Sequence, residues 1–150
     1  MSNYKTVFFI IGVLQIILGI FMAIPIFSQF IFSEIDSSFI TSSAITLVFG
    51  VLFVLSNLDY EKKINLKQAF LLTTLSWLTI AIFGSLPFYF SDLNISFTDS
   101  FFESMSGLTT TGSTIISNLE LAPKSVLLWR ALLQWLGGIG IIVMAITLMP

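Results

Sequence analysis

Long uncharged stretches, separated by short polar connections, dominate the hydrophobic pattern of this chain. A helix needs about 20 mainly apolar residues to cross the ~30 Å hydrocarbon layer of a membrane. Four stretches meet this requirement, and we expect a membrane-spanning helix in each. They are Thr6–Phe32, Phe39–Leu58, Lys67–Phe90 and Lys124–Pro150. Pro25 lies near the far end of the first stretch, where it is expected to kink or end the helix.

The connection between the third and fourth stretches, residues 91–123, is too polar to be a fifth span. It contains Ser96-Phe97-Thr98-Asp99, which has the form of a helix capping box. The apolar residues that follow recur at helical spacing: Phe101, Phe102, Met105 and Leu108. This pattern predicts a helix of roughly ten residues that ends at Gly107. Because such a helix cannot cross a membrane, we expect it to be re-entrant.

A loop rich in hydroxyl groups follows the short helix, with the sequence Thr109-Thr110-Thr111-Gly112-Ser113. Irregular backbone at membrane depth is tolerated only where protein buries it or where it lines an aqueous path. Main-chain carbonyls of such a loop can replace the water around a cation, and Gly112 makes the necessary backbone conformations accessible. The order of span, short helix, polar loop and span therefore favours an ion pore. A purely structural re-entrant turn is the alternative.

The composition supports a membrane protein and argues against several other classes. Of the 150 residues, 56% are hydrophobic and only 9% are charged, too few to cover the surface of a soluble domain. The chain has no Cys and no His, which excludes disulfides, thiol chemistry and imidazole metal sites. Its six Lys and Arg residues form no basic patch for nucleic acid. No nucleophile–base pair is evident at membrane depth, so we do not expect an enzyme.

The lysines determine the expected orientation in the membrane. Lys5 precedes the first stretch, and Lys62, Lys63 and Lys67 lie between the second and the third, so both chain termini are expected to be cytoplasmic. The opposite side would hold six carboxylates: Glu34, Asp36, Asp92, Asp99, Glu103 and Glu120. These either concentrate cations at a pore mouth or are ordinary solvated loop residues.

The fourth stretch contains a charge and a glycine cluster, and each has two interpretations. Arg130 within a span costs about 2.5–3.5 kcal/mol unless it reaches the interface or finds a partner. We favour an ion pair with Glu103 of the short helix. Gly137, Gly138 and Gly140 either allow close helix packing or form a hinge that bends during gating.

Three segments carry a resemblance to a known family: residues 99–114 (DSFFESMSGLTTTGST), Leu128-Trp129-Arg130, and residues 134–141 (QWLGGIGI). They resemble the first pore repeat of TrkH-type potassium uptake subunits, which belong to the Trk/Ktr/HKT superfamily. The resemblance is specific from residue 99 to 141 and loose before Lys67. It agrees with an all-α integral membrane fold of four transmembrane helices and one re-entrant pore helix. Residues 1–66 would form a two-helix hairpin, and residues 67–150 a helix–pore loop–helix repeat.

In this family, four repeats each contribute one loop with a characteristic glycine to a central filter, and Gly112 matches that glycine. Some sodium-conducting relatives resemble this pattern but carry serine there. The resemblance thus implies K⁺ as the transported ion, bound by the carbonyls of Thr110, Thr111 and Gly112, with Ser113 as a further ligand and Thr109 in support. No other bound cofactor is implied. The implied surroundings are the bacterial inner membrane and its lipid, the remaining pore repeats, and a cytoplasmic nucleotide-binding regulatory subunit.

A fourfold filter needs four loops, and the sequence contains one loop of this kind. We therefore expect the chain to be a fragment that does not conduct alone. A homotetramer of single-repeat chains and a split gene are the alternatives. The rival function is that of a non-conducting membrane scaffold or accessory protein whose polar loop is structural.

Overall fold

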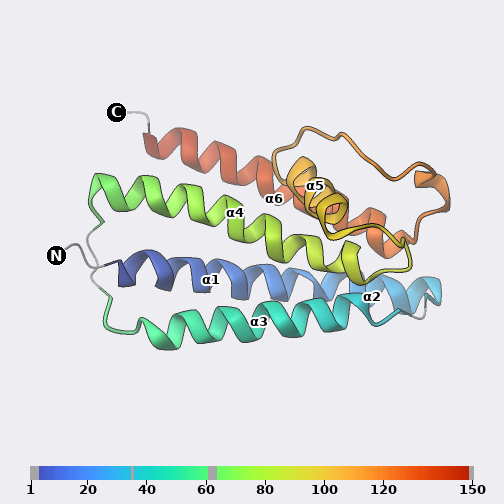
Figure 1. Cartoon of the computed structure of the whole chain (residues 1–150), viewed down its shortest axis with the longest axis horizontal. Coiled ribbons are helices and arrows are strands. Elements are labelled where there is room, and N and C mark those ends of the chain that lie inside the picture. Colours follow the sequence, from blue (N-terminus) through green and yellow to red (C-terminus); the bar gives the residue numbers. More distant parts are fainter. Residues whose placement is uncertain (1–3, 35, 61–63, 149–150) are drawn as a thin grey trace.

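The structure, a computed structural model, describes residues 4–34, 36–60 and 64–148, with side chains as far as residue 142. Every regular element in these ranges is a helix (Figure 1). Four helical segments are long and apolar enough to cross a membrane: Lys5–Phe32, Ser38–Ser56, Leu66–Phe90 and Lys124–Ile142. The prediction of an all-helical fold with four apolar spans is thus confirmed.

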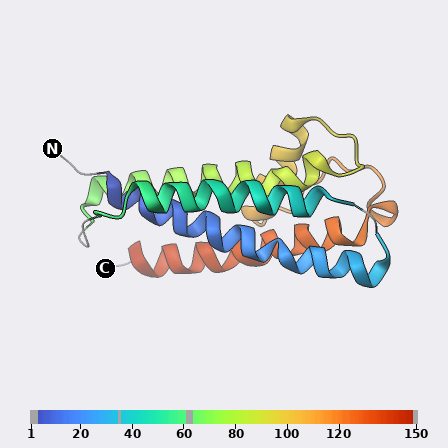
Figure 2. The same cartoon turned by 90° about the horizontal axis from the view of Figure 1, so that it is seen from below.

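The first span is interrupted, and the interruption lies earlier than Pro25. Helix α1 (Lys5–Phe21) ends before Met22, and α2 (Ala23–Phe32) continues in nearly the same direction (Figure 2). A proline ring clashes with the carbonyl four residues before it and has no N–H to donate. For Pro25 that carbonyl belongs to Phe21, the last residue of α1. The predicted proline effect therefore acts one turn upstream of the proline itself.

The helix α3 (Ser38–Ser56) packs against α1 through glycine. A Cβ atom added to Gly12 would lie 2.9 Å from the carbonyl oxygen of Gly50, and one added to Gly50 would lie 2.9 Å from the main-chain nitrogen of Ile16. The hydroxyl of Ser43 donates to the carbonyl of Gly19 across the same interface, at 2.8 Å. Small residues let helix backbones approach closely in lipid, where the hydrophobic effect does not drive helices together.

The helix α4 (Leu66–Phe90) runs parallel to α1 and begins at a capping box. The Asn65 side chain accepts from the Gln68 N–H, and the Gln68 side chain accepts from the Asn65 N–H, both at 2.9 Å. The last span, α6 (Lys124–Leu148), returns antiparallel to α4. Consequently α1 begins and α6 ends at the same end of the bundle (Figure 2).

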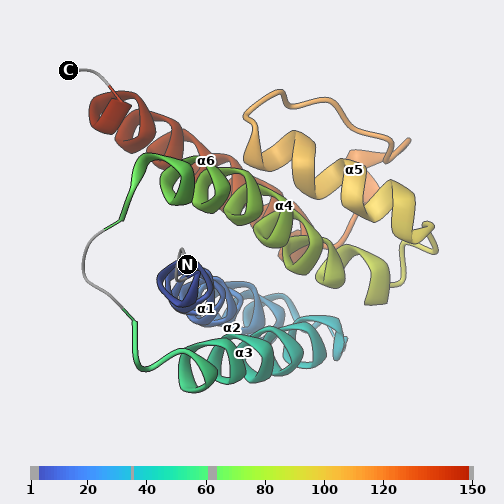
Figure 3. The same cartoon turned by 60° about the vertical axis from the view of Figure 1, so that its left-hand side comes forward.

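Between α4 and α6 the chain forms α5 (Phe97–Leu108), a long loop and a single 3-10 turn at Leu119–Leu121. Helix α5 lies against α4 and α6, on the side away from α1 and α3 (Figure 3). A buried core joins α1, α3, α4 and α6. Its residues are Leu18, Met22, Phe39, Phe88, Val126, Trp129 and Leu133. The indole N–H of buried Trp129 donates to the carbonyl of Gly84 at 2.9 Å, which fixes α6 against α4.

Candidate ion-binding loop

The polar loop begins where α5 ends, in a left-handed turn. Thr110 has φ of +58°, and its N–H donates to the carbonyl of Gly107 at 2.9 Å, while the Thr111 N–H donates to Ser106 at 3.0 Å. This pair of bonds is the Schellman arrangement that satisfies the last carbonyls of a helix. A β-branched residue in this conformation is uncommon and costs about 1–2 kcal/mol.

The prediction that Gly107 ends the short helix was wrong. Helix α5 continues to Leu108, and Thr110 rather than a glycine adopts the left-handed conformation. Gly107 instead lies inside the helix, where an added Cβ would be 3.2 Å from the Cβ of Leu133. Its small size serves helix packing, and the sequence pattern does not distinguish this use from a helix stop.

The predicted ion ligands lie together on one exposed stretch of backbone, residues 109–113. Within the part of the chain that the structure describes, the carbonyl oxygens of Thr109, Thr110, Thr111 and Gly112 accept no hydrogen bond. Four successive main-chain acceptors are thus available beyond the carboxyl end of α5. That end carries a partial negative charge of about half an elementary charge, which favours a cation nearby.

Ser113 differs from the other four residues, because its carbonyl already has a donor. The hydroxyl of Ser106 donates to it at 2.6 Å, which fastens the returning part of the loop to α5. On the other side, the Thr109 hydroxyl donates to the carbonyl of Met105 at 2.8 Å and lies 2.9 Å from the Thr111 hydroxyl. These hydroxyls hold the loop, whereas the free carbonyls belong to the main chain.

The buried carboxylate of Glu103 connects α5, the loop and α6. One of its oxygens accepts from the Thr114 hydroxyl at 3.0 Å and from the Ile115 N–H at 3.2 Å. The other accepts from the Nε–H of Arg130, forming an ion pair. The Glu103 side chain is 0% exposed and the Arg130 side chain 13%. The structure thus brings the two predicted partners together, and Arg130 does not extend to solvent.

Gly112 has φ of +78°, a conformation that side chains rarely adopt. An added Cβ would meet only the amide nitrogen of Gln134, at 3.8 Å. Backbone conformation, and not lack of space, is therefore what requires glycine at this position.

The three glycines of α6 occupy different environments. A Cβ on Gly137 would lie 1.7 Å from the carbonyl oxygen of Leu108, the last residue of α5. A Cβ on Gly138 would lie 3.9 Å from the Thr110 methyl group, and one on Gly140 would have nothing within 4 Å. Gly137 therefore lets α6 touch the end of α5 directly, which corresponds to the close-packing interpretation.

Glu34 has a role that its local sequence does not predict. Its carboxylate accepts from the Lys124 N–H at 2.6 Å, the Ser125 N–H at 3.2 Å and the Ser125 hydroxyl at 2.6 Å, so it caps the start of α6. Partial burial alone would raise the pKa of Glu34, but the hydrogen bonds from Ser125 and Lys124 outweigh this and lower its pKa. Glu34 and the start of α6 at Lys124 are 90 residues apart in the sequence, so no local motif predicts this contact. Asp36 is also engaged, because it accepts from the Ser38 N–H at 2.8 Å.

These features define a multi-pass α-helical membrane protein with a polar, carbonyl-rich loop between its third and fourth spans. Residues 35–150 match the TrkH family of cation transport proteins, and the chain belongs to this family. The family resemblance predicted from the loop and α6 residues is thereby confirmed.

Three relatives show the extent of the match. The Trk system potassium uptake protein TrkI of Halomonas elongata is 44% identical over 94% of this chain and 29% of its own length. TrkH of Escherichia coli strain K12 is 35% identical over 99% of this chain and 31% of its own length. The crystal structure of the potassium transporter TrkH from Vibrio parahaemolyticus has a TM-score of 0.91 and 35% identity, covering 97% of this chain and 32% of that chain. The chain therefore spans about a third or less of the length of these relatives.

Proposed function

We propose that this chain supplies one wall of a potassium filter, as the first of four repeats in a TrkH-type uptake subunit. The observation that carries the proposal is the row of unpaired carbonyls at Thr109–Gly112, on an exposed loop beyond the carboxyl end of α5. The carbonyls of Thr110, Thr111 and Gly112 are the ion ligands. Ser113 contributes its remaining lone pair and Thr109 supports the loop. Helix α5 then acts as a re-entrant pore helix.

The ligand type favours a monovalent cation. Ca²⁺ sites in proteins use several carboxylates, and Mg²⁺ sites usually use one or two. Residues 109–113 contain no Asp or Glu, so the loop offers neutral dipoles instead. A ring of such carbonyls can replace the water shell of K⁺. One loop provides only one side of a ring, and the remaining pore repeats supply the others.

The Glu103–Arg130 pair holds the loop in place in this proposal. Because Glu103 bonds both the loop and α6, its loss would release Thr114 and Ile115 from the helices behind them and leave the Ser106–Ser113 bond to hold the loop. The ion pair has a positioning role and does not touch the ion.

The proposed surroundings follow from the lysines and from the family. The protein lies in the bacterial inner membrane, in contact with lipid. The start of α1 at Lys5 and the end of α6 at Leu148 both lie on the cytoplasmic side. A cytoplasmic nucleotide-binding regulatory subunit is the proposed partner beneath that side.

The test is a chimera in which this chain replaces the matching 31% of TrkH from Vibrio parahaemolyticus. It is expressed in a strain that lacks potassium uptake, and growth at low potassium and Rb⁺ uptake are measured. We expect the chimera to support growth and Gly112→Asp to abolish it, because the new carboxylate adds backbone strain and a charge at the ligands. Gly140→Ala, on the same repeat but remote from neighbouring atoms, is the matched control and should retain uptake.

Unchanged Rb⁺ uptake in the Gly112→Asp chimera, at equal protein levels, would instead support the scaffold function and a structural loop. The chain alone provides a second arm. We expect it not to restore growth, whereas growth that Gly112→Asp removes would show that copies of this single repeat close a filter themselves.

A further inference from the structure

Gln134 of α6 lies beside the glycine of the candidate ion-binding loop. Beyond its chain neighbours, a Cβ atom added to Gly112 would have one heavy atom within 4 Å, the Gln134 amide nitrogen at 3.8 Å. The half-buried Gln134 side chain makes no hydrogen bond within the residues that the structure describes. Its amide therefore has two N–H donors to offer beside the free carbonyls of the loop.

The position of Gln134 follows from the way α6 lies along the loop. Residues four apart share one face of a helix, and Arg130, Gln134 and Gly138 are spaced in this way. Arg130 pairs with Glu103, which holds the returning end of the loop. Gly138 lies at the start of the loop, where an added Cβ would be 3.9 Å from the Thr110 methyl group. The loop thus runs antiparallel to α6, and Gln134 faces the middle of it.

Main-chain carbonyls are the loop groups that the Gln134 amide can reach as a donor. The N–H groups of Thr111 and Gly112 both donate to the carbonyl of Ser106, at 3.0 and 3.3 Å. The loop is therefore fastened to α5 through its N–H groups, and among the described residues the carbonyls of Thr111 and Gly112 stay free. A carbonyl oxygen has two lone pairs, so it can accept from an amide and still bind a cation.

We propose that Gln134 is a positioning residue for ion selectivity, and that its amide N–H donates to one lone pair of the Gly112 carbonyl. This inference rests on the proposed filter function. Selection of K⁺ over Na⁺ depends on the size of a carbonyl ring or on the number and field strength of its dipoles. A donor behind the carbonyl limits its approach to a smaller ion and weakens its field. Gln134 thus disfavours Na⁺ without touching the ion.

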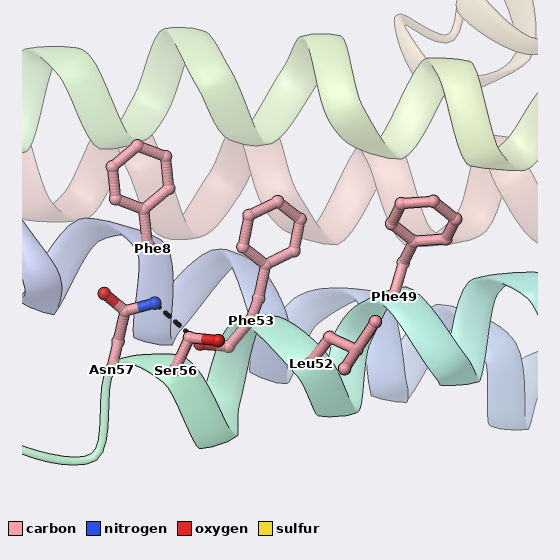
Figure 4. Close-up of a pocket in the computed structure, with 6 residues that line it drawn as sticks. All are labelled: Phe8, Phe49, Leu52, Phe53, Ser56 and Asn57. Carbon is pink, nitrogen blue, oxygen red and sulfur yellow. Dashed lines mark hydrogen bonds between the residues drawn. The ribbon is translucent and has the colours of Figure 1, made fainter.

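Asn57 at the end of α3 provides a matched amide that already has a partner. Its N–H donates to the carbonyl of Phe53 at 2.8 Å, and both residues line an apolar groove on α1 and α3 (Figure 4). Helix α3 lies on the side of the bundle away from α5 and the loop (Figure 3). Asn57→Leu therefore removes an amide of similar shape without reaching the loop.

The test measures Rb⁺ uptake by the chimera and the inhibition of this uptake by Na⁺. Gln134→Met keeps the length of the side chain and removes both donors. We expect Na⁺ to inhibit this variant at an about fivefold lower concentration, as one lost hydrogen bond predicts. Gln134→His, measured near pH 8 where the ring is neutral but keeps an N–H, should retain most of the discrimination. Asn57→Leu should leave the inhibiting concentration unchanged.

The inhibiting concentration does not depend on the amount of folded protein, so a purely structural role of Gln134 would not move it. Unchanged discrimination in Gln134→Met would overturn the proposal, and an equal loss in Gln134→His would overturn the role of the donor. Gln134→Leu carries the same expectation as Gln134→Met and replaces it should that variant not accumulate. Absence of Rb⁺ uptake in the unmodified chimera would instead contradict the proposed function, and this inference with it.

Discussion

Helices are held together by different contacts in two regions of this membrane protein, the α1–α3 hairpin and the α5–α6 region. In the hairpin, Gly12 and Gly50 bring regular helices into backbone contact. In the α5–α6 region, an irregular loop is bonded to α5 by the side chains of Ser106 and Glu103. Glu103 in turn forms an ion pair with Arg130 of α6. Gly137 occurs in the second region too, but there it touches the end of a helix rather than its side.

The difference follows from where the backbone finds its hydrogen bonds. A regular helix satisfies its own N–H and carbonyl groups, so its neighbours need only fit it closely. A loop at membrane depth cannot do so and needs side-chain partners. Where the loop between Thr109 and Gly112 keeps free carbonyls, these are the groups that we propose for the ion. The buried Glu103–Arg130 ion pair thus occurs in the α5–α6 region because the loop there needs a side-chain acceptor for its backbone.

The largest expected effect comes from breaking the Glu103–Arg130 pair. Arg130→Gln or Glu103→Gln alone should lower the free energy of unfolding by about 3–5 kcal/mol, because each leaves a buried charge without its partner. The measurement is unfolding in detergent micelles by titration with sodium dodecyl sulfate, together with Rb⁺ uptake of the chimera.

The double variant tests whether the two residues act through each other. Glu103→Gln/Arg130→Gln should cost clearly less than the two single effects added together. Glu120→Gln, an exposed carboxylate in the 3-10 turn between α5 and α6, should change stability by less than about 0.5 kcal/mol. Additive single effects would show that the charges act separately, and normal uptake in Arg130→Gln would remove the positioning role.

The next largest effect is expected at Gly137. Gly137→Ala places a methyl group 1.7 Å from the Leu108 carbonyl, which a shift of α5 or α6 must relieve. We expect a loss of about 3 kcal/mol and reduced Rb⁺ uptake, because the end of α5 carries the loop. Gly140→Ala has open space and should be neutral or slightly stabilising. Similar behaviour of both variants would favour a hinge function over close packing.

The hairpin should respond to the same substitution more weakly and in stability alone. Gly12→Ala puts a methyl group 2.9 Å from the Gly50 carbonyl and the Phe53 side chain, a milder overlap than at Gly137. We expect a loss of about 1–2 kcal/mol, with Rb⁺ uptake retained in the surviving folded protein. Specific loss of uptake at full stability would show that the hairpin, and not only the α5–α6 region, determines transport.

Local patterns and long-range contacts differ in how well they could be predicted. Hydrophobic stretches predicted four spans, and the Ser96 cap predicted the start of α5, because both signals lie in adjacent residues. The end of α5 lies one residue beyond the predicted Gly107, because Gly107 is small to accommodate the Leu133 side chain of α6 and not to stop the helix. For Glu34 the sequence predicts only a solvated or vestibule carboxylate, because the partner of Glu34 lies 90 residues away. Such contacts depend on how the helices pack, which periodicity does not reveal.

The smallest predicted effect concerns Glu34, the cap that joins the hairpin to α6. Glu34→Gln should cost about 1 kcal/mol at neutral pH, since a neutral amide accepts the N–H groups of Lys124 and Ser125 less strongly. The pKa of Glu34 is lower in the folded state than its ordinary value of 4.5. Its stabilisation is therefore complete above pH 4.5 and is lost as the pH falls through the folded-state pKa. Unfolding titrations should show the gap between the unmodified chain and Glu34→Gln closing below pH 4.5, whereas a gap that widened with acid would contradict the capping role.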